Sequence, residues 1–264
     1  MKLIVLSDLH LMAPGAANDL GNQARLAAAV ARINAGYDDA DLVIVAGDIA
    51  DRGSVAVYAE AHATLSQLTP PWVATVGNHD DRGAFLRVFD GTAGFAQYAR
   101  VVDGHHVLVL DSLKLSPDGP YPVAPEGELC ADRLSWLDAR LAEAKGAPVV
   151  VALHHHVVPV DTRMDPYTLE APEELIERLA AHGHVRHVIS GHIHMTTTSF
   201  HRGIPFTTLA GGHSTSVEDF GRKTNKRRLT GPAQMAIVLS DDRKTTLHFD
   251  NYNDAHAAFE RDET

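Results

Sequence analysis

The sequence predicts a layered α/β fold, and three observations support that prediction. Short runs rich in Val, Ile and Leu recur along the first three-quarters of the chain, each near the length of one strand. The runs are nearly continuous in hydrophobicity, which is typical of strands covered on both faces. Helical patterns separate several of the runs, and strands that alternate with helices are characteristic of α/β folds. At 264 residues, the chain fits one large domain or a domain with a small appendage.

The expected elements follow one another in a regular order. Six apolar runs predict strands at residues 2–7, 41–47, 71–77, 106–112, 148–153 and 185–190. Helical spacing predicts helices at residues 22–34, 54–68, 131–146 and 172–183. In the last of these, Pro172 stands near the start and Gly183 marks the stop. The final third predicts a β-rich end, with strands at residues 203–212, 233–242 and 244–252 and no long helix between them.

The charge of the chain argues against one class of partner. Lys and Arg number 23 against 34 Asp and Glu, which gives a formal net charge of −11. A protein that follows long nucleic acid needs a basic face, so we expect no long nucleic acid as a partner. One basic cluster, Arg222 to Arg228, is interpreted first as a solvated loop and second as a charge that attracts an anionic substrate.

Signals for targeting and for disulfide bonding are few. Cys130 is the single cysteine, so the chain has no disulfide framework. No segment is long enough to span a bilayer, and the N-terminal apolar run is too short for a signal peptide. We therefore expect a cytoplasmic protein with no membrane partner.

Polar side chains able to bind metal follow five of the expected strands, at the point where each strand ends. They are Asp8 and His10; Asp48 and Asp51; Asn78, His79 and Asp80; His154, His155 and His156; and His192 and His194. Ligands of open α/β sheets bind outside the carboxyl ends of the strands. One cleft would therefore collect groups from all five strand ends.

The chemistry of this set predicts a pair of transition-metal ions. Carboxylate oxygen and imidazole nitrogen suit divalent Mn, Fe, Zn or Co, whereas Mg and Ca prefer oxygen ligands alone. Seven groups are available, too many for one ion: Asp8, His10, Asp48, Asn78, one histidine of 154–156, His192 and His194. Two ions about 3.5–4 Å apart that share one carboxylate would use them. Gly47, Gly77 and Gly191 precede these groups and would let the backbone approach the ions closely.

The order of these motifs resembles the calcineurin-like metallophosphoesterase superfamily. The matching motifs are Asp-x-His at 8–10, Gly-Asp-x-x-Asp at 47–51, Gly-Asn-His-Asp at 77–80, the histidines at 154–156 and Gly-His-x-His at 191–194. Size and spacing resemble the branch of class III cyclic-nucleotide phosphodiesterases and glycerophosphodiesterases. The resemblance implies a four-layer α/β/β/α sandwich. We expect a catalytic core at residues 1–200 and, at 201–264, a β-rich C-terminal part that completes the second sheet or forms a small cap.

The same resemblance implies which residues hold the ions. One ion would be bound by Asp8, His10, Asp48 and His194, and the other by Asp48, Asn78, His154 and His192, with Asp48 as the bridge. The family motif His-His-Pro-Pro is replaced here by HHHVVP, so His155 is the alternative to His154. Manganese and iron are expected first, with zinc or cobalt as alternatives.

Residues around the ions receive roles in the same way. His79 would act as a catalytic residue that contacts the phosphate and the leaving group, with Asn78 also on the substrate. Asp80 would orient His79, as carboxylates beside catalytic groups often do. Asp51 is expected to hold its own loop through backbone hydrogen bonds. His213, after two glycines, is expected either to touch the substrate or to lie on a surface loop.

Together these features predict a phosphodiesterase that hydrolyses small phosphodiesters by attack of a metal-bridging hydroxide. The expected substrates are cyclic nucleotides, either 3′,5′-cAMP and cGMP or 2′,3′-cyclic nucleotides. The alternatives are a glycerophosphodiester phosphodiesterase, a broad phosphomonoesterase or nuclease, and a non-catalytic scaffold of the same fold. An exposed strand edge in the β-rich end would allow pairing with a second copy, as a homodimer or a higher homo-oligomer.

Overall fold

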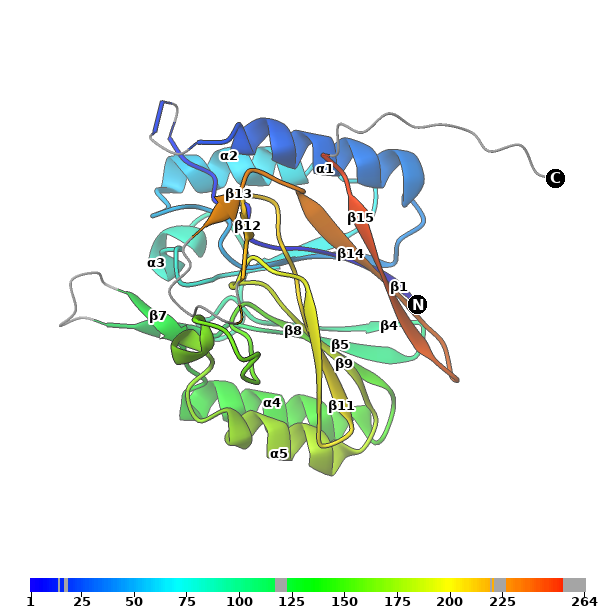
Figure 1. The fold of residues 1–264 in the computed structure, drawn as a ribbon. Helices are drawn as coiled ribbons and strands as arrows, with labels where there is room; N and C mark the ends of the chain where they lie inside the picture. Colours follow the sequence, from blue (N-terminus) through cyan, green and yellow to red (C-terminus); the bar gives the residue numbers. More distant parts are fainter. Residues whose placement is uncertain (14, 17–18, 117–122, 219, 221–226, 254–264) are drawn as a thin grey trace.

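Two large β-sheets lie face to face in the middle of the structure, and helices cover the outer face of each (Figure 1). The computed structural model describes residues 1–264 apart from 14, 17–18, 117–122, 219, 221–226 and 254–264. The order of layers is helix, sheet, sheet, helix, which confirms the expected four-layer α/β/β/α sandwich. Within the described part of the chain, no helix combines the length and the apolar character needed to cross a membrane.

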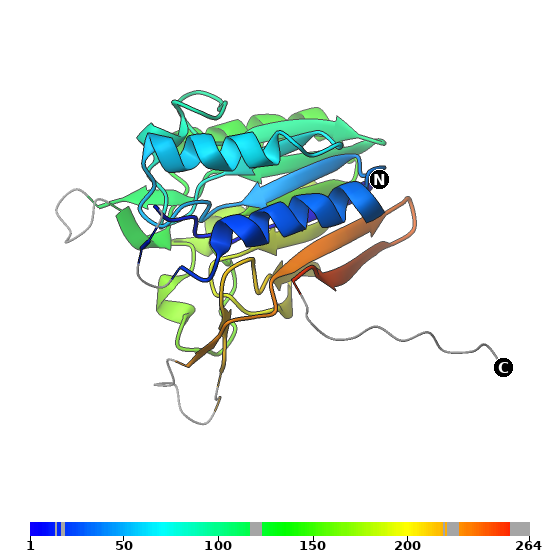
Figure 2. The same cartoon turned by 90° about the horizontal axis from the view of Figure 1, so that it is seen from above.

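The first sheet has the strand order β15–β14–β1–β2–β3. Its strands are β1 (Lys2–Leu6), β2 (Leu42–Ala46), β3 (Trp72–Thr75), β14 (Gln234–Ser240) and β15 (Thr245–Asn251). β1, β2 and β3 run parallel, and β14 is antiparallel to both of its neighbours. Helices α1 (Asn22–Gly36) and α2 (Val55–Leu65) connect the parallel strands and lie side by side over this sheet (Figure 2).

The second sheet has the strand order β10–β11–β9–β8–β5–β4. Its strands are β4 (Tyr98–Val102), β5 (His105–Leu110), β8 (Val149–Leu153), β9 (Val185–Ser190), β10 (Thr197–His201) and β11 (Ile204–Thr208). The four inner strands are parallel, and the outer strands β4 and β10 are antiparallel to their neighbours. Helices α4 (Ala131–Ala144) and α5 (Pro172–His182) cover the outer face. Gly183 ends α5 with φ 78°, a left-handed conformation that glycine adopts readily.

Alternation along the strands explains why the core divides into three apolar layers. In β1, Leu3 and Val5 face the second sheet and join the cluster between the two sheets. Ile4 and Leu6 face the other way, into the cluster that includes α1 and α2. A third cluster joins β5 and β8 to α4 and α5. Both faces of the central strands are therefore buried, which is why these strands have continuous apolar sequences.

Smaller elements extend from the ends of the sheet strands. β6 (Leu113–Leu115) pairs with β7 (Val123–Gly127), and β12 (Thr215–Ser216) pairs with β13 (Arg228–Leu229). The short helix α3 (Arg82–Phe85) follows β3, and the 3-10 turn η1 (Asp165–Tyr167) precedes α5. All the expected strands and helices are present, with ends shifted by a few residues. β11 joins the second sheet whereas β14 and β15 join the first, and the division of the chain at residue 200 stays a prediction.

Candidate metal centre

Side chains that follow β1, β2, β3, β8 and β9 converge on one buried centre, as the carboxyl ends of parallel strands predict. Asp48 lies in the middle of it. Its Oδ2 is 3.5 Å from His10 Nε2 and 3.3 Å from His154 Nε2. The same His154 nitrogen is 3.1 Å from Asn78 Oδ1. Asp48 is therefore reached from two sides by imidazoles that come from different sheets.

A second set of contacts surrounds Asp8. Its Oδ1 lies 3.5 Å from His194 Nε2, which is in turn 3.1 Å from His10 Nε2. The backbone amide of His192 donates to the Asp8 carboxylate at 3.0 Å. Asp8 is fully buried, and burial, with Asp48 nearby, raises the pKa of its carboxyl group to about 6. A neighbouring cation would favour the carboxylate form of this residue.

Backbone carbonyls determine which ring nitrogen of three histidines faces the centre. Nδ1 of His154 lies 3.0 Å from Ala46 O, and Nδ1 of His194 lies 2.6 Å from Ser214 O. A carbonyl only accepts, so each Nδ1 carries a hydrogen, and in the neutral ring each Nε2 turns a lone pair inward. His192 is held the other way round. Its Nε2 lies 3.1 Å from the carbonyl oxygen of Tyr167, so Nδ1 is the nitrogen whose lone pair can bind a metal ion. The lone pairs of neutral ring nitrogens repel nearby carboxylate oxygens, and a cation between them removes that repulsion. These residues therefore fit bound metal ions.

Electrostatics keep most of these imidazoles in the form that binds metal. Burial lowers the pKa of His10 and His192 well below the usual value and lowers that of His194 to about 3. Neutral imidazole is the metal-binding form. His154 differs, because Asp48 outweighs the effect of burial and raises the His154 pKa to about 9. A bound metal ion would displace the proton that Asp48 favours on His154, because only the neutral ring can bind metal.

The backbone at the centre adopts a conformation that is costly outside functional sites. Five of the predicted ligands have φ between 46° and 76°: Asp8, His10, Asp48, His192 and His194. Residues other than glycine seldom adopt this left-handed conformation, and each such residue costs of order 1–3 kcal/mol. The packing of the two sheets holds this strain and aims the side chains at one point.

Two glycines allow the chain segments of the centre to come close together. A Cβ atom at Gly191 would lie 1.8 Å from Ser7 Oγ and 2.4 Å from Asp8 Oδ2. A Cβ atom at Gly77 would lie 2.2 Å from Asp48 Oδ1. Any side chain at either position would displace a predicted ligand, which confirms that these glycines permit close approach.

The consecutive histidines after β8 occupy different environments. His154 reaches Asp48, so the structure brings this residue, rather than His155, to the shared carboxylate. His155 turns Nδ1 towards Ser112 Oγ at 2.8 Å. Its Nε2 is buried and has no hydrogen-bond partner among the described residues. The geometry therefore favours His154 over His155 as the ligand.

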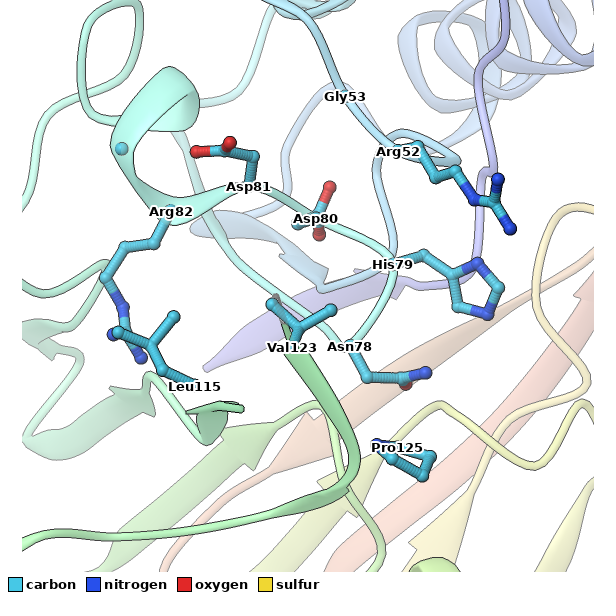
Figure 3. Close-up of a pocket in the computed structure, with 11 residues that line it drawn as sticks. Arg52, Gly53, Asn78, His79, Asp80, Asp81, Arg82, Leu115, Val123 and Pro125 are labelled. Atoms are coloured by element: carbon cyan, nitrogen blue, oxygen red, sulfur yellow. The ribbon is translucent and has the colours of Figure 1, made fainter. Parts of the chain in front are cut away.

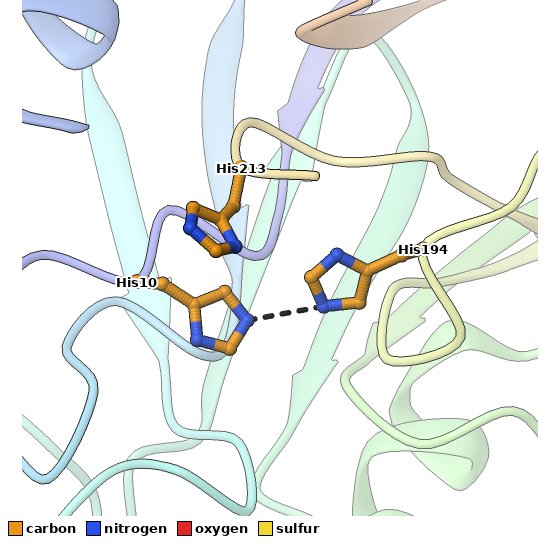
Figure 4. A group of neighbouring side chains, drawn as sticks. All are labelled: His10, His194 and His213. Carbon is orange, nitrogen blue, oxygen red and sulfur yellow. Dashed lines mark hydrogen bonds between the residues drawn. The ribbon is translucent and has the colours of Figure 1, made fainter. Parts of the chain in front are cut away.

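His213 belongs to the same group of imidazoles, as Figure 4 shows. Its ring centroid lies 5.1 Å from that of His10 and 6.2 Å from that of His194. The segment between β11 and β12 carries it there, far in sequence from both neighbours. This placement supports the expectation of substrate contact over that of a remote surface loop, and the role itself stays a prediction.

His79 lies beside the centre, but its partner differs from the one predicted. His79 Nδ1 is 2.5 Å from Asp51 Oδ1. Asp80 turns into the fold, where it accepts hydrogen bonds from the amides of Gly77 at 2.8 Å and Ala50 at 3.0 Å. The expectation that Asp80 orients His79 is wrong, because these buried amides engage its carboxylate. Asp51 was expected to hold its own loop through backbone hydrogen bonds, but its carboxylate contacts His79, and its place in the Gly-Asp-x-x-Asp motif was a signal of a role at the site.

The contact with Asp51 also favours the protonated form of His79. Burial lowers the pKa of His79, but the charge of Asp48 and the hydrogen bond with Asp51 outweigh burial and raise the pKa to about 9. The backbone amide of His79 donates to Asp48 Oδ1 at 2.8 Å, which ties the residue to the centre. With Nδ1 donating to Asp51, the Nε2 hydrogen is the one that a ligand would meet.

Two hollows share His79 in their linings. The larger, the apolar hollow, has a volume of about 710 Å³ and is walled by Leu115, Val123 and Pro125, with Asn78 beside His79 (Figure 3). The smaller, the histidine hollow, has a volume of about 400 Å³. It is lined by His10, Met12, Leu20, Asp51, His79, His194, His213, Ser214, Arg228, Leu229 and Thr230. The apolar hollow has the size of a typical small-molecule site.

Comparison with known proteins explains this combination of fold and centre. Residues 1–196 match the calcineurin-like phosphoesterase model. The chain belongs to the calcineurin-like phosphoesterase family. It is 36% identical over 221 residues to a probable cyclic nucleotide phosphodiesterase of Rhodopseudomonas palustris, covering 80% of this chain and 78% of that protein. It is 31% identical to a 3′,5′-cyclic adenosine monophosphate phosphodiesterase of Pseudomonas aeruginosa, covering 73% of this chain and 69% of that protein.

A solved structure agrees with this calcineurin-like fold. A dimetal phosphatase from Danio rerio superposes with a TM-score of 0.71 and 17% sequence identity, covering 94% of this chain and 95% of that chain. At that identity the likeness concerns the fold alone. Family membership, together with the clustered Asp and His ligands, implies two divalent metal ions in this chain.

Proposed function

We propose that this calcineurin-like phosphoesterase hydrolyses small phosphodiesters and that cyclic nucleotides are its substrates. The observation that carries the proposal is the position of Asp48, whose Oδ2 lies 3.5 Å from His10 Nε2 and 3.3 Å from His154 Nε2. A carboxylate reached from both sides suits a pair of ions that share one ligand. The relatives named as cyclic nucleotide phosphodiesterases support the substrate class. The apolar hollow beside His79 offers room for a base and a ribose.

The proposal assigns the ligands as two overlapping sets. Asp8, His10, Asp48 and His194 would hold one ion, and Asp48, Asn78, His154 and His192 the other. The mixture of oxygen and nitrogen donors favours transition metals over Mg or Ca. Manganese and iron are the metals proposed for the two sites, with zinc or cobalt as alternatives.

In the proposed reaction, two ions held by these residues would supply an activated water and would neutralise the phosphate oxygens. The residues of the chain orient the substrate and move the proton. Asp51 holds Nδ1 of His79, so that the protonated ring presents Nε2–H to the departing oxygen. His79 then acts as general acid and donates that proton to the alkoxide. Leu115 and Val123 in the wall of the apolar hollow would shield the base from water.

A substrate panel with defined manganese, iron, zinc and cobalt loading tests this proposal. We expect kcat/KM for 3′,5′-cAMP, cGMP or a 2′,3′-cyclic nucleotide to exceed the values for a glycerophosphodiester and for p-nitrophenyl phosphate. A higher value for the glycerophosphodiester or for the monoester would overturn the assignment of substrate. Full metal content without turnover of any compound would favour a non-catalytic scaffold.

The cytoplasmic location and the homo-oligomeric state expected from the sequence stay predictions. In the described structure, β15 is the outer strand of the first sheet and offers the edge at which a second copy would pair. Light scattering of the purified protein measures the oligomeric state directly.

A further inference from the structure

Arg228 is a cation of the histidine hollow that the proposed reaction does not yet use. It lies in β13, opposite Ser216 of β12. Its Nη1 is 3.3 Å from the hydroxyl oxygen of Ser214, the residue whose carbonyl holds His194. Arg228 is the last member of the basic cluster seen in the sequence, and residues 222–226 of that cluster lie outside the described residues. The structure thus places one charge of this cluster at the metal centre.

Arg25 anchors the β12–β13 hairpin that carries Arg228. It extends from α1 and is only 9% exposed. Its Nη1 donates to the carbonyl of His213 at 2.5 Å, and its Nη2 donates to the carbonyl of Thr230. These two carbonyls precede β12 and follow β13, so one buried guanidinium ties both arms to α1. Arg228 is therefore positioned by the fold, which reduces the entropy lost when a ligand binds.

The charges around Arg228 favour an anionic ligand. Arg228 is exposed to solvent, and partial burial of its side chain and the nearby guanidinium of Arg163 lower its pKa, whereas Asp8 opposes this effect. Arg163 has an ion-pair contact with Glu218, at 3.6 Å between Nε and Oε1. Asp8 belongs to the metal centre, where the ions would share its charge. Arg163 thus has a carboxylate partner, and Arg228 is the guanidinium of the two that lines the histidine hollow, where an anionic ligand would meet it.

We propose that Arg228 binds the phosphate of the substrate and holds the negative charge that hydrolysis adds to it. This inference rests on the proposed function. Hydrolysis breaks the bond from phosphorus to the leaving oxygen and forms one to the oxygen of water. His79 gives a proton to the leaving alkoxide, and the proton that water loses balances it. The monoanionic diester becomes a monoester whose second proton is released near neutral pH, so the product carries additional negative charge. A guanidinium contacts two phosphoryl oxygens at once, which a lysine ammonium does not.

Arg228→Met tests this role, because methionine keeps much of the alkyl chain and removes the charge. Hydrogen bonds to charged groups are worth about 1.5–3 kcal/mol, which corresponds to roughly a 10- to 100-fold change. We expect kcat/KM for a diester to fall by that factor and the inhibition constant of orthophosphate to rise by a similar factor. Arg228→Lys should restore part of the phosphate affinity. Arg227→Met is the matched control, since Arg227 is the adjacent residue and lies outside the lining of the histidine hollow.

The assay separates this inference from the proposed function. Orthophosphate inhibition is measured against bis(p-nitrophenyl) phosphate, so that the result does not depend on cyclic nucleotides being substrates. If the wild-type protein leaves cyclic nucleotides intact while Arg228→Met weakens phosphate inhibition, the proposed substrate is wrong and the role of Arg228 holds. Equal phosphate inhibition in wild type and Arg228→Met would overturn that role. Loss of bound metal from Arg228→Met would also overturn it, because the residue would then be structural.

Discussion

The loop after β2 and the loop after β3 have similar sequences but use their acidic residues in opposite ways. Each loop begins with a glycine and a predicted metal ligand, Asp48 in the first and Asn78 in the second. Each then carries a second carboxylate, Asp51 or Asp80. Asp51 is partly exposed and reaches His79 of the other loop, whereas Asp80 is 2% exposed and binds backbone amides. Each second carboxylate therefore acts across the gap between the loops.

This difference indicates that one carboxylate supports the proposed reaction, whereas the other stabilises the fold. Asp51 raises the pKa of His79 and faces the histidine hollow. Asp80 accepts hydrogen bonds from the amides of Ile49 and Ala50 and from the hydroxyl of Tyr58, and so holds the first loop in shape. Variants of the two loops should accordingly fall into two classes, one that changes turnover and one that changes stability.

Asp48→Ala is expected to have the largest effect. The variant removes the carboxylate that both proposed ions share, so we expect both to be lost and turnover to fall to that of metal-free protein. Metal content is measured by mass spectrometry of the purified protein. Asp39→Ala is the control, because Asp39 is an exposed carboxylate paired with Lys2. Retention of two ions by Asp48→Ala would show that this residue does not bridge.

His79→Ala is expected to have the next largest effect, and on turnover alone. Loss of a general acid lowers the rate by roughly 10²- to 10⁴-fold. Metal content should stay near normal, since His79 is proposed to donate a proton and not to bind an ion. Steady-state kinetics and metal analysis on the same preparation check this. A large loss of bound metal would show that His79 is a metal ligand and would contradict its role as a general acid.

Asp80→Ala should mainly reduce stability. The change leaves buried amides of Gly77 and Ala50 without their acceptor, and an unsatisfied buried group costs about 1–3 kcal/mol. We expect the free energy of unfolding to fall by about 3 kcal/mol in urea denaturation. Asp80→Asn keeps one acceptor oxygen and should lose less. Unchanged stability in Asp80→Ala would contradict the structural role of this carboxylate.

Asp51→Asn should have the smallest effect and should leave stability nearly unchanged. Removing a carboxylate that supports a catalytic group typically costs roughly 10- to 100-fold in activity, and we expect a loss near the lower figure. Because Asp51 raises the pKa of His79, its replacement lowers that pKa. The protonated, active form then disappears at a lower pH, so the alkaline limb of the kcat profile should shift to lower pH. A limb that stays in place would mean that Asp51 does not set the protonation of His79.

Much of the fold was predictable because its central strands are buried on both faces. β1, β2 and β8 are nearly continuous apolar runs, and every expected strand and helix is present. The strands that were not expected lie at edges or in short hairpins, where one face meets water. In β4, for example, Arg100 and Val101 are exposed, so no apolar run marks the strand. Sequence patterns report burial, and they fail where burial is partial.

By itself, the sequence determined which groups would meet at the centre. A polar residue that directly follows a buried parallel strand lies at the carboxyl end of the sheet, whichever residues surround it there. The tertiary structure alone decided which groups face one another: Asp51 with His79, Asp80 with the amides of the neighbouring loop, and Arg228 with the histidine hollow. These contacts depend on the directions of side chains on loops far apart in the chain. Burial and hydrogen bonding set those directions only once the two sheets have packed.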